Sequence, residues 1–301
     1  MVAVRTWFLQ TRPSFLLLVP VCVLVGLATA VYDTRELNGL HFGLAFLGAL
    51  LAHVSVNVLN EYSDYRSGID MNTRKTPFSG GSGILPAGLL DPRKVFLFGL
   101  TCLSAVAAIG IYFIYEYGWE ILPLGFLGIV AVCFYTTHMT KDPFLCAIAP
   151  GLGFGPLMVL GTYFTQTGEY TLSAGMASMI PGFLVSNLLL LNQFPDVEAD
   201  RAGARRHLPI ALGRRHSARI YAALILITYV WLVFAAAFDV LPPTALLGLL
   251  TLPLGLKAIR GVLRYFDDID HLIPFMGINV MVTLLTPLLV GVGILIGMAV
   301  D

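Results

Sequence analysis

The sequence has few charged residues for its length. Only 12% of its 301 residues are Asp, Glu, Lys or Arg, 57% are hydrophobic, and the mean hydropathy is +0.82. Soluble domains average about 25% charged residues, so this composition excludes a soluble globule and indicates an integral membrane protein. Eighteen basic and eighteen acidic residues give no net charge. The overall charge therefore points to no acidic partner, and we expect no nucleic acid to bind.

The sequence also lacks the signals of a cysteine metal site and of a nucleotide-binding P-loop. The four cysteines, Cys22, Cys102, Cys133 and Cys146, have no metal-ligand spacing and lie in or beside apolar segments, so we interpret them as packing residues. The glycine-rich stretch 76–88 (TPFSGGSGILPAG) lacks the Lys-Ser/Thr pair that follows the loop of a nucleotide-binding P-loop. It is either a mobile cap over a site or a plain connector.

Long apolar runs are abundant. Each helical crossing of a bilayer needs about 20 apolar residues, and the first run follows Arg5 and Arg12 and is long enough to be a retained span instead of a signal peptide. The runs predict an all-α, polytopic membrane bundle of nine transmembrane helices, in one domain covering residues 1–301. The predicted spans are 15–31, 40–59, 95–115, 121–137, 148–164, 176–194, 218–238, 242–259 and 273–298.

The basic residues orient the chain. If the N-terminus is cytoplasmic, the inner joints are 60–94, 138–142, 195–217 and 257–271. Together with the N-terminal tail and Arg219 at a span border, these joints hold every Lys and Arg except Arg35. The positive-inside rule then predicts a cytoplasmic N-terminus, and nine spans put the C-terminus on the opposite side.

A first cluster of polar residues ends the second span. Spacings of three and four place His53, Asn57, Asn60 and Asp64 on one helical face. Gly68 permits a break in the helix, so that Asp70 can turn back towards this face.

A second cluster ends the sixth span. Asn192, Asp196 and Asp200 follow one another at intervals of four, which predicts a single helical face. Asp196 lies 132 positions after Asp64, and each cluster ends an even-numbered span. We therefore predict two pseudo-repeated four-helix halves plus a ninth helix, with the two acidic ends facing each other.

Carboxylates at this depth need a cation, because an acid at the centre of a span costs about 2.5–3.5 kcal/mol. Ligands made only of carboxylate and amide oxygens suit Mg²⁺, and basic residues after both clusters suit phosphate. The sequence thus predicts a Mg²⁺-diphosphate site at the inner mouth of the bundle. The competing interpretations are two solvated loops, and a transporter, which would carry ionisable groups near the midplane of the bilayer instead of at span ends.

These residues resemble the UbiA superfamily of intramembrane prenyltransferases. The run Asn57-x-x-Asn60-Glu61-Tyr62-x-Asp64-x-x-x-Gly68-x-Asp70 resembles the first family motif, most closely in the form found in the 1,4-dihydroxy-2-naphthoate prenyltransferases of menaquinone synthesis. The run Asn192-x-x-x-Asp196-x-x-x-Asp200, followed by Arg205, resembles the second. Weaker matches are Arg12-Pro13, Tyr135-Thr136 and Phe154-Gly155, and Glu61, Ala204 and His207 depart from the family pattern.

The resemblance implies transfer of a prenyl group from a polyprenyl diphosphate to an aromatic, naphthoate-like acceptor, in menaquinone or quinone synthesis in a prokaryotic cell membrane. Other acceptors, and cyclisation of the prenyl substrate, remain alternatives. The implied Mg²⁺ ligands are Asp64, Asp70, Asp196 and Asp200, with Asp64, Asp196 and Tyr135 as catalytic residues. The implied substrate-binding residues are Asn57, Asn60, Arg66, Arg74, Lys75, Asn192 and Arg205. The aromatic candidates for stabilising an allylic cation are Phe78, Tyr135, Phe154, Tyr163 and Phe183.

Overall fold

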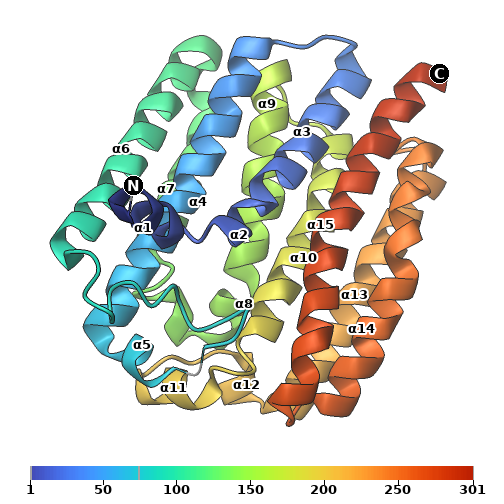
Figure 1. Cartoon of the computed structure of the whole chain (residues 1–301). Helices are drawn as coiled ribbons and strands as arrows, with labels where there is room; N and C mark the ends of the chain where they lie inside the picture. The colour runs from blue at the N-terminus through green and yellow to red at the C-terminus, as the bar shows by residue number, and fades with distance from the viewer. Residues whose placement is uncertain (1, 74, 301) are drawn as a thin grey trace.

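The computed structural model describes residues 2–73 and 75–300, and every regular element within these residues is helical. The long helices run side by side along one common direction (Figure 1). The α-helices are α1 (Val2–Gln10), α2 (Pro13–Leu16), α3 (Leu18–Thr34), α4 (Gly39–Ser67), α5 (Ile69–Asn72), α6 (Pro92–Tyr117), α7 (Leu122–Phe134), α8 (Pro143–Leu152), α9 (Gly161–Thr167), α10 (Leu172–Asn192), α11 (Val197–Ala202), α12 (Leu208–Ala211), α13 (Arg214–Ala237), α14 (Leu252–Tyr265) and α15 (Ile269–Val300). Short 3₁₀ helices cover Gly118–Ile121, Met139–Lys141 and Pro243–Thr251, and Gly153–Leu160 is a π-helix.

Within the described residues, eight continuous helical segments are long and apolar enough to cross a membrane. One of them, Pro92–Phe134, has 43 residues, which at 1.5 Å per residue is about 64 Å, or twice the hydrocarbon thickness of a bilayer. The regular α-helix ends at Gly118, whose φ of 78° and ψ of −161° lie outside the helical region. Because α6 and α7 are separate helices, this segment is long enough for two crossings, so the eight segments are consistent with the approximately nine spans predicted from the sequence.

The outside of the bundle is apolar. Large side chains that a soluble protein would bury are exposed along its length, among them Tyr115, Phe126, Phe144, Val230 and Phe238. A surface of this kind is stable only in lipid. The chain is therefore an integral, multi-pass membrane protein.

Packing differs between the two sides of the bundle. The largest buried cluster joins α3 to α10, α13, α14 and α15 through side chains such as Val25, Leu184, Tyr221 and Ile294. On the other side, α4, α6, α7 and the segment from α8 to α9 surround a cavity of about 570 Å³, a size typical of ligand sites. This central cavity begins beside the short helices α5 and α11, which lie at the lower end of the bundle in Figure 1, and α15 ends at the opposite end.

Candidate active site

The first acidic cluster has the predicted geometry. Helix α4 continues to Ser67 and carries Asn57, Asn60 and Asp64 into the central cavity. Its C-cap, Gly68, has a φ of 76°, a conformation that residues with a side chain rarely adopt. The chain turns there into α5, and Asp70 comes back to line the same cavity with only 8% of its surface exposed.

The second cluster is built differently from the prediction of one helical face, which is wrong. Helix α10 ends at Asn192, a turn containing Pro195 follows, and Asp196 immediately precedes α11, which carries Asp200. A proline has no amide hydrogen and disfavours the helical conformation of the residue before it, so the helix cannot continue through this point. Asn192, Asp196 and Asp200 nevertheless all line the central cavity.

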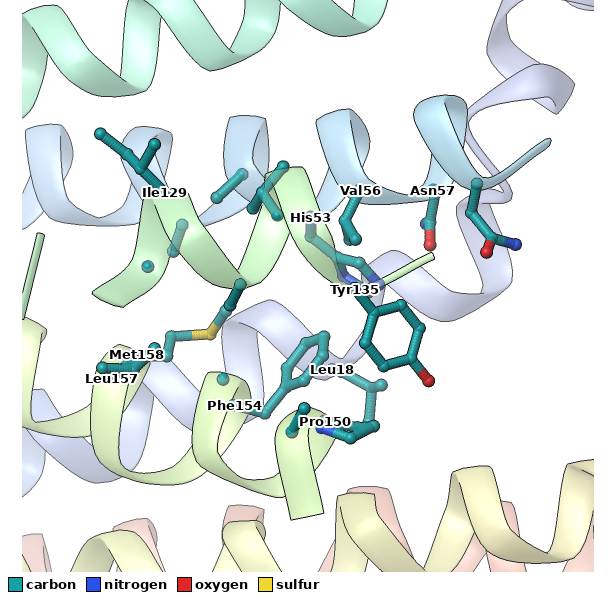
Figure 2. Close-up of a pocket in the computed structure, with 18 of the residues that line it drawn as sticks. Leu18, His53, Val56, Asn57, Ile129, Tyr135, Pro150, Phe154, Leu157 and Met158 are labelled. Carbon is teal, nitrogen blue, oxygen red and sulfur yellow. The ribbon is translucent and has the colours of Figure 1, made fainter. Parts of the chain in front are cut away.

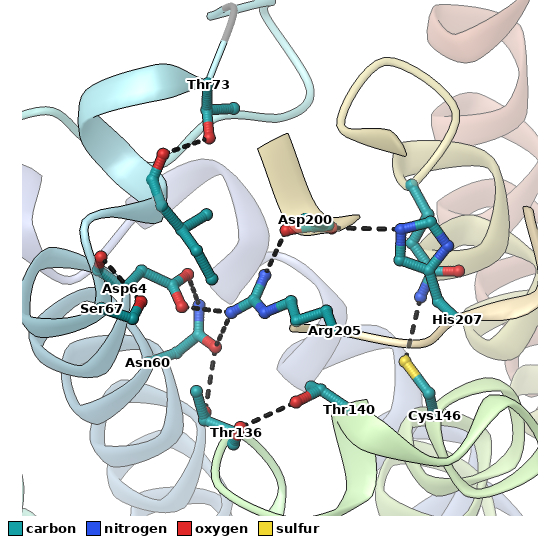
Figure 3. A network of polar contacts seen from close by, with 12 residues as sticks. Asn60, Asp64, Ser67, Thr73, Thr136, Thr140, Cys146, Asp200, Arg205 and His207 are labelled. Carbon is teal, nitrogen blue, oxygen red and sulfur yellow. Dashed lines mark hydrogen bonds and ion pairs between the residues drawn. The ribbon is translucent and has the colours of Figure 1, made fainter. Parts of the chain in front are cut away.

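Arg205 joins the two clusters (Figure 3). Its guanidinium donates one hydrogen bond from Nη1 to Asp200 Oδ1, at 3.0 Å, and another from Nη2 to Asp64. Asn60 Nδ2 donates to Asp64 Oδ2 at 3.0 Å and thereby fixes the carboxylate. The acidic ends of the two motifs therefore meet at one mouth, held by a partly buried cation of the chain itself.

Two residues outside the two motifs, Thr136 and His207, also contact this network. Thr136, just after α7, donates from Oγ1 to Asn60 Oδ1 at 2.9 Å. The imidazole Nε2 of His207 lies 3.2 Å from Asp200 Oδ2, and His207 is almost fully buried. The residue that departs from the family pattern at position 207 thus contacts a carboxylate of the second motif.

The remaining oxygens of the site fit a hard cation. Asp70 Oδ2, Asn192 Oδ1 and Asp196 Oδ1 are buried and accept no hydrogen bond from the described residues. Burial, reinforced by neighbouring carboxylates, raises the pKa of Asp70 and of Asp196 to about 7. The positive charges of Arg205 and Arg12 offset this only in part, so the two carboxylates can accept a further positive charge, and oxygen-only donors of this kind suit Mg²⁺.

The arrangement is not closed around an ion. Across residues 2–73 and 75–300, no three acidic, histidine or cysteine side chains are gathered closely enough to hold one metal. The guanidinium of Arg205 lies between Asp64 and Asp200 instead. Metal binding by both motifs together therefore requires Arg205 to give up at least one of these partners.

The basic residues predicted to bind phosphate are mostly elsewhere. Arg66 is exposed and lies beside Asp91 and Arg93, and Lys75 is exposed against Gly83, so neither lines the central cavity. Arg74 falls outside the described residues. Of the three predicted basic residues that the structure describes, Arg205 alone lines the central cavity.

Arg12 is a site residue that the prediction left out. It lines the central cavity, with its Nε 3.8 Å from Glu61 Oε1 and its guanidinium over the ring of Phe15 at 4.3 Å. The only sequence signal was the Arg-Pro pair before the first span. Arg12 and Arg205 are the arginines that face this cavity within the described part of the chain.

Glu61 has a structural role that explains its difference from the usual Asp. Its buried carboxylate accepts hydrogen bonds from the backbone amide of Ser82, at 2.7 Å, and from the Ser82 hydroxyl. Both donors belong to the glycine-rich stretch 76–88, and residues Phe78 to Gly81 of this stretch line the cavity. Glu61 therefore fastens the loop over the mouth of the site.

Replacing Glu61 with glutamine is expected to loosen this loop. A glutamine offers one acceptor oxygen in place of two charged ones, so one Ser82 donor loses its partner, and a hydrogen bond to a charged group is worth about 1.5–3 kcal/mol. We expect faster hydrogen exchange of the amides at 79–84 in Glu61→Gln, and a similar change in Ser82→Ala. Unchanged exchange in both variants, measured by mass spectrometry, would contradict the assigned contact.

Aromatic side chains line part of the cavity (Figure 2). Of the five predicted candidates, Phe78, Tyr135 and Phe154 line it. Tyr163 is a core residue whose hydroxyl donates to Asp33 Oδ2 at 2.8 Å, and Phe183 packs on Trp231 with ring centroids 5.9 Å apart. The prediction was therefore wrong in placing the last two at the site.

The comparison with protein families decides the identity. The model of the "UbiA prenyltransferase family" matches residues 18–297. The chain belongs to the UbiA prenyltransferase family. A UbiA homologue from Archaeoglobus fulgidus, solved with DMAPP and Mg²⁺, has the same fold, with a TM-score of 0.60 at 15% identity over 95% of this chain and 98% of that chain.

Two curated relatives of this UbiA protein are similar over most of its length. The 1,4-dihydroxy-2-naphthoate octaprenyltransferase of Haemophilus influenzae is 29% identical, covering 97% of this chain and 96% of the relative. The enzyme of the same name from Bacillus subtilis is 25% identical, covering 84% and 81%. Membership of a prenyltransferase family makes the chain an enzyme, and the transporter interpretation is set aside.

Proposed function

We propose that this UbiA protein transfers a prenyl group from a polyprenyl diphosphate to a 1,4-dihydroxy-2-naphthoate-like acceptor in menaquinone or quinone synthesis, and releases diphosphate. One observation carries the proposal: the two Asp motifs meet at the polar mouth of a single cavity whose deeper walls are apolar. The names of the relatives supply the acceptor class.

The carboxylates of Asp64, Asp70, Asp196 and Asp200 would hold Mg²⁺. Bound there, Mg²⁺ neutralises the charge that develops on the leaving diphosphate. Arg205 and Arg12 bind the outer phosphate oxygens, because guanidinium groups form charge-assisted pairs with phosphate. When a phosphate oxygen takes the place of Asp64 or Asp200 as a partner of Arg205, the carboxylate is released for the metal.

Amide groups at the mouth orient these charges. Asn60 accepts from Thr136 and donates to Asp64, so it acts as a positioning residue. Asn57 donates from Nδ2 to the carbonyl of Thr11, at 3.1 Å, which holds the segment that carries Arg12. Asn192 presents its unpaired Oδ1 and is the amide best placed to act as a ligand.

The deeper cavity provides the environment that the chemistry needs. An isoprenoid tail gains about 0.8 kcal/mol per buried CH₂, and the apolar walls exclude the water that would quench an allylic cation. The rings of Tyr135 and Phe154 line the cavity, and aromatic rings can stabilise positive charge. Tyr135 is therefore proposed as a catalytic residue.

The mouth is proposed to open to the cytoplasm. All Lys and Arg residues except Arg35 lie in the N-terminal segment or in the joints on the side of the motifs, so the positive-inside rule places that side and the N-terminus inside the cell. The C-terminus is then on the opposite side. We propose a prokaryotic cell membrane as the location and one catalytic domain over residues 1–301.

Product analysis tests the proposal. Full-length protein in lipid nanodiscs is incubated with labelled prenyl diphosphate, Mg²⁺ and 1,4-dihydroxy-2-naphthoate, and each component is omitted in turn. We expect a prenylated naphthalene product and diphosphate only when all three are present. A cyclic hydrocarbon formed without acceptor would favour a cyclase, and prenylation of other phenols but not of the naphthoate would favour a different acceptor.

A further inference from the structure

One polar side chain in the central cavity has no part in holding diphosphate. His53 lies on α4 four residues before Asn57 and lines the cavity about 6 Å deeper along the helix. It precedes Asp64 by eleven residues, which places it about 16 Å along the helix axis from that carboxylate. Only 5% of its surface is exposed.

The surroundings of His53 are apolar and aromatic. Its ring makes an edge contact with Phe154, with centroids 4.7 Å apart and an interplanar angle of 80°. Figure 2 shows the imidazole pointing into the cavity, towards Tyr135 and Phe154. Met158 and Pro150 line the same region of the cavity.

One nitrogen of the imidazole lacks a hydrogen-bond partner among the described residues. Nδ1 of His53 is buried and makes no hydrogen bond to any described residue. A buried polar atom without a partner lowers stability, and an apolar side chain of similar size would avoid this cost. A partner supplied by a bound ligand removes the same cost, and the open cavity provides the room for such a ligand.

The chemistry of the two substrates decides which of them supplies a hydrogen-bond partner for His53. A prenyl tail has no hydrogen-bonding group, and its diphosphate is held at the mouth by the two Asp motifs. The acceptor is a flat ring that carries hydroxyl groups. A neutral imidazole with its proton on Nε2 accepts a hydrogen bond at Nδ1, and the ring of Phe154 offers an aromatic surface beside it.

We propose that His53 binds a hydroxyl group of the aromatic acceptor through Nδ1 and thereby orients the acceptor ring in the cavity. This inference rests on the proposed prenyl transfer to a hydroxylated aromatic ring. It assigns the acceptor to the α4 wall beside Phe154, one helical turn deeper than Asn57.

Three variants at one position test the assignment. His53→Leu removes the acceptor atom. His53→Asn keeps a polar atom close to the position of Nδ1, and His53→Gln places its amide further along the side chain. Leu47→Ala, which changes an exposed residue of the same helix outside the cavity, is the matched control. Binding of 1,4-dihydroxy-2-naphthoate to each full-length protein in nanodiscs is measured by calorimetry without prenyl diphosphate, and KM is measured for both substrates.

We expect His53→Leu to weaken acceptor binding and raise its KM by about 10- to 100-fold, with the KM for prenyl diphosphate nearly unchanged. His53→Asn should recover most of the affinity, and Leu47→Ala should resemble the wild type. If His53→Leu does not fold, the comparison of His53→Asn with His53→Gln tests the inference. We then expect His53→Asn to bind the acceptor more tightly than His53→Gln.

Acceptor affinity that is the same in all His53 variants as in the wild type would overturn the inference. An equal rise of both KM values in His53→Leu would also overturn it, because that result indicates a general disturbance of the cavity. Failure of the proposed function looks different: the wild type itself would then neither bind nor prenylate the naphthoate.

Discussion

Asp64→Asn and Asp196→Asn are each expected to abolish Mg²⁺-dependent release of diphosphate while the protein still folds. Each substitution keeps the shape of the side chain and removes one negative charge from the site. The loss of one preorganised electrostatic group typically lowers turnover by about 10²–10³-fold, and a lost metal ligand should reach at least this range. The measurement is diphosphate released per enzyme in nanodiscs over a Mg²⁺ titration.

Glu198→Gln is the matched control for these variants. Glu198 lies on α11 between Asp196 and Asp200, but its side chain is 75% exposed and pairs only with the exposed Arg201, at 3.7 Å. Its substitution removes one negative charge from the same helix without entering the cavity, so turnover should stay at the wild-type level. Retained turnover in both Asp variants would refute the assignment of the site, and loss of turnover in Glu198→Gln would show that overall charge matters more than position.

The first motif was predictable because it lies on one continuous helix. The spacing of Asn57, Asn60 and Asp64 gives a face directly, and Gly68 marks the end of that face. The second motif also has helical spacing, at intervals of four, but Pro195 interrupts the helix between Asn192 and Asp196. The proline was visible in the sequence, and its effect on the helix outweighs the periodicity of the acidic residues.

The partners of the motifs were less predictable than the motifs themselves. Arg66 and Lys75 follow the first cluster closely in sequence, yet the chain directs them away from the cavity. Arg12 reaches it from a separate segment. Once a helix has ended, proximity in the sequence no longer determines the direction of a side chain. The glycine-rich stretch 76–88, which binds Glu61, has no periodicity, so its contacts cannot be predicted from the sequence.

The aromatic lining shows a related difficulty within the membrane. Tyr163 and Phe183 lie in spans of high mean hydropathy, where hydropathy alone does not distinguish the faces. In a membrane helix the lipid-facing, core-facing and cavity-facing positions can all be apolar. The family motif identified Tyr135 and Phe154, and packing alone decides the other positions.

Arg205→Met is expected to have the second large effect, on stability as well as on turnover. Removing the guanidinium leaves Asp64 and Asp200 buried without their cation. Loss of one partner of a buried ion pair destabilises a protein by about 3–5 kcal/mol, and turnover should also fall, because the phosphate oxygens lose their charge-assisted donor. Arg201→Gln, which removes a neighbouring, exposed arginine, should change neither quantity.

Arg205→Met also tests whether Arg205 competes with Mg²⁺ for Asp64 and Asp200 or only stabilises the fold. In the wild type without substrate, Arg205 occupies Asp64 and Asp200, so Mg²⁺ finds only Asp70 and Asp196 as free carboxylate ligands and should raise the midpoint of thermal unfolding only slightly. In Arg205→Met the two carboxylates are available, so Mg²⁺ should raise the midpoint markedly without any diphosphate. An equal response of both proteins would contradict this competition. If it holds, diphosphate and Mg²⁺ must bind cooperatively in the wild type, because a phosphate that draws Arg205 away frees the ligands of the metal, and coupling between two ligands is reciprocal.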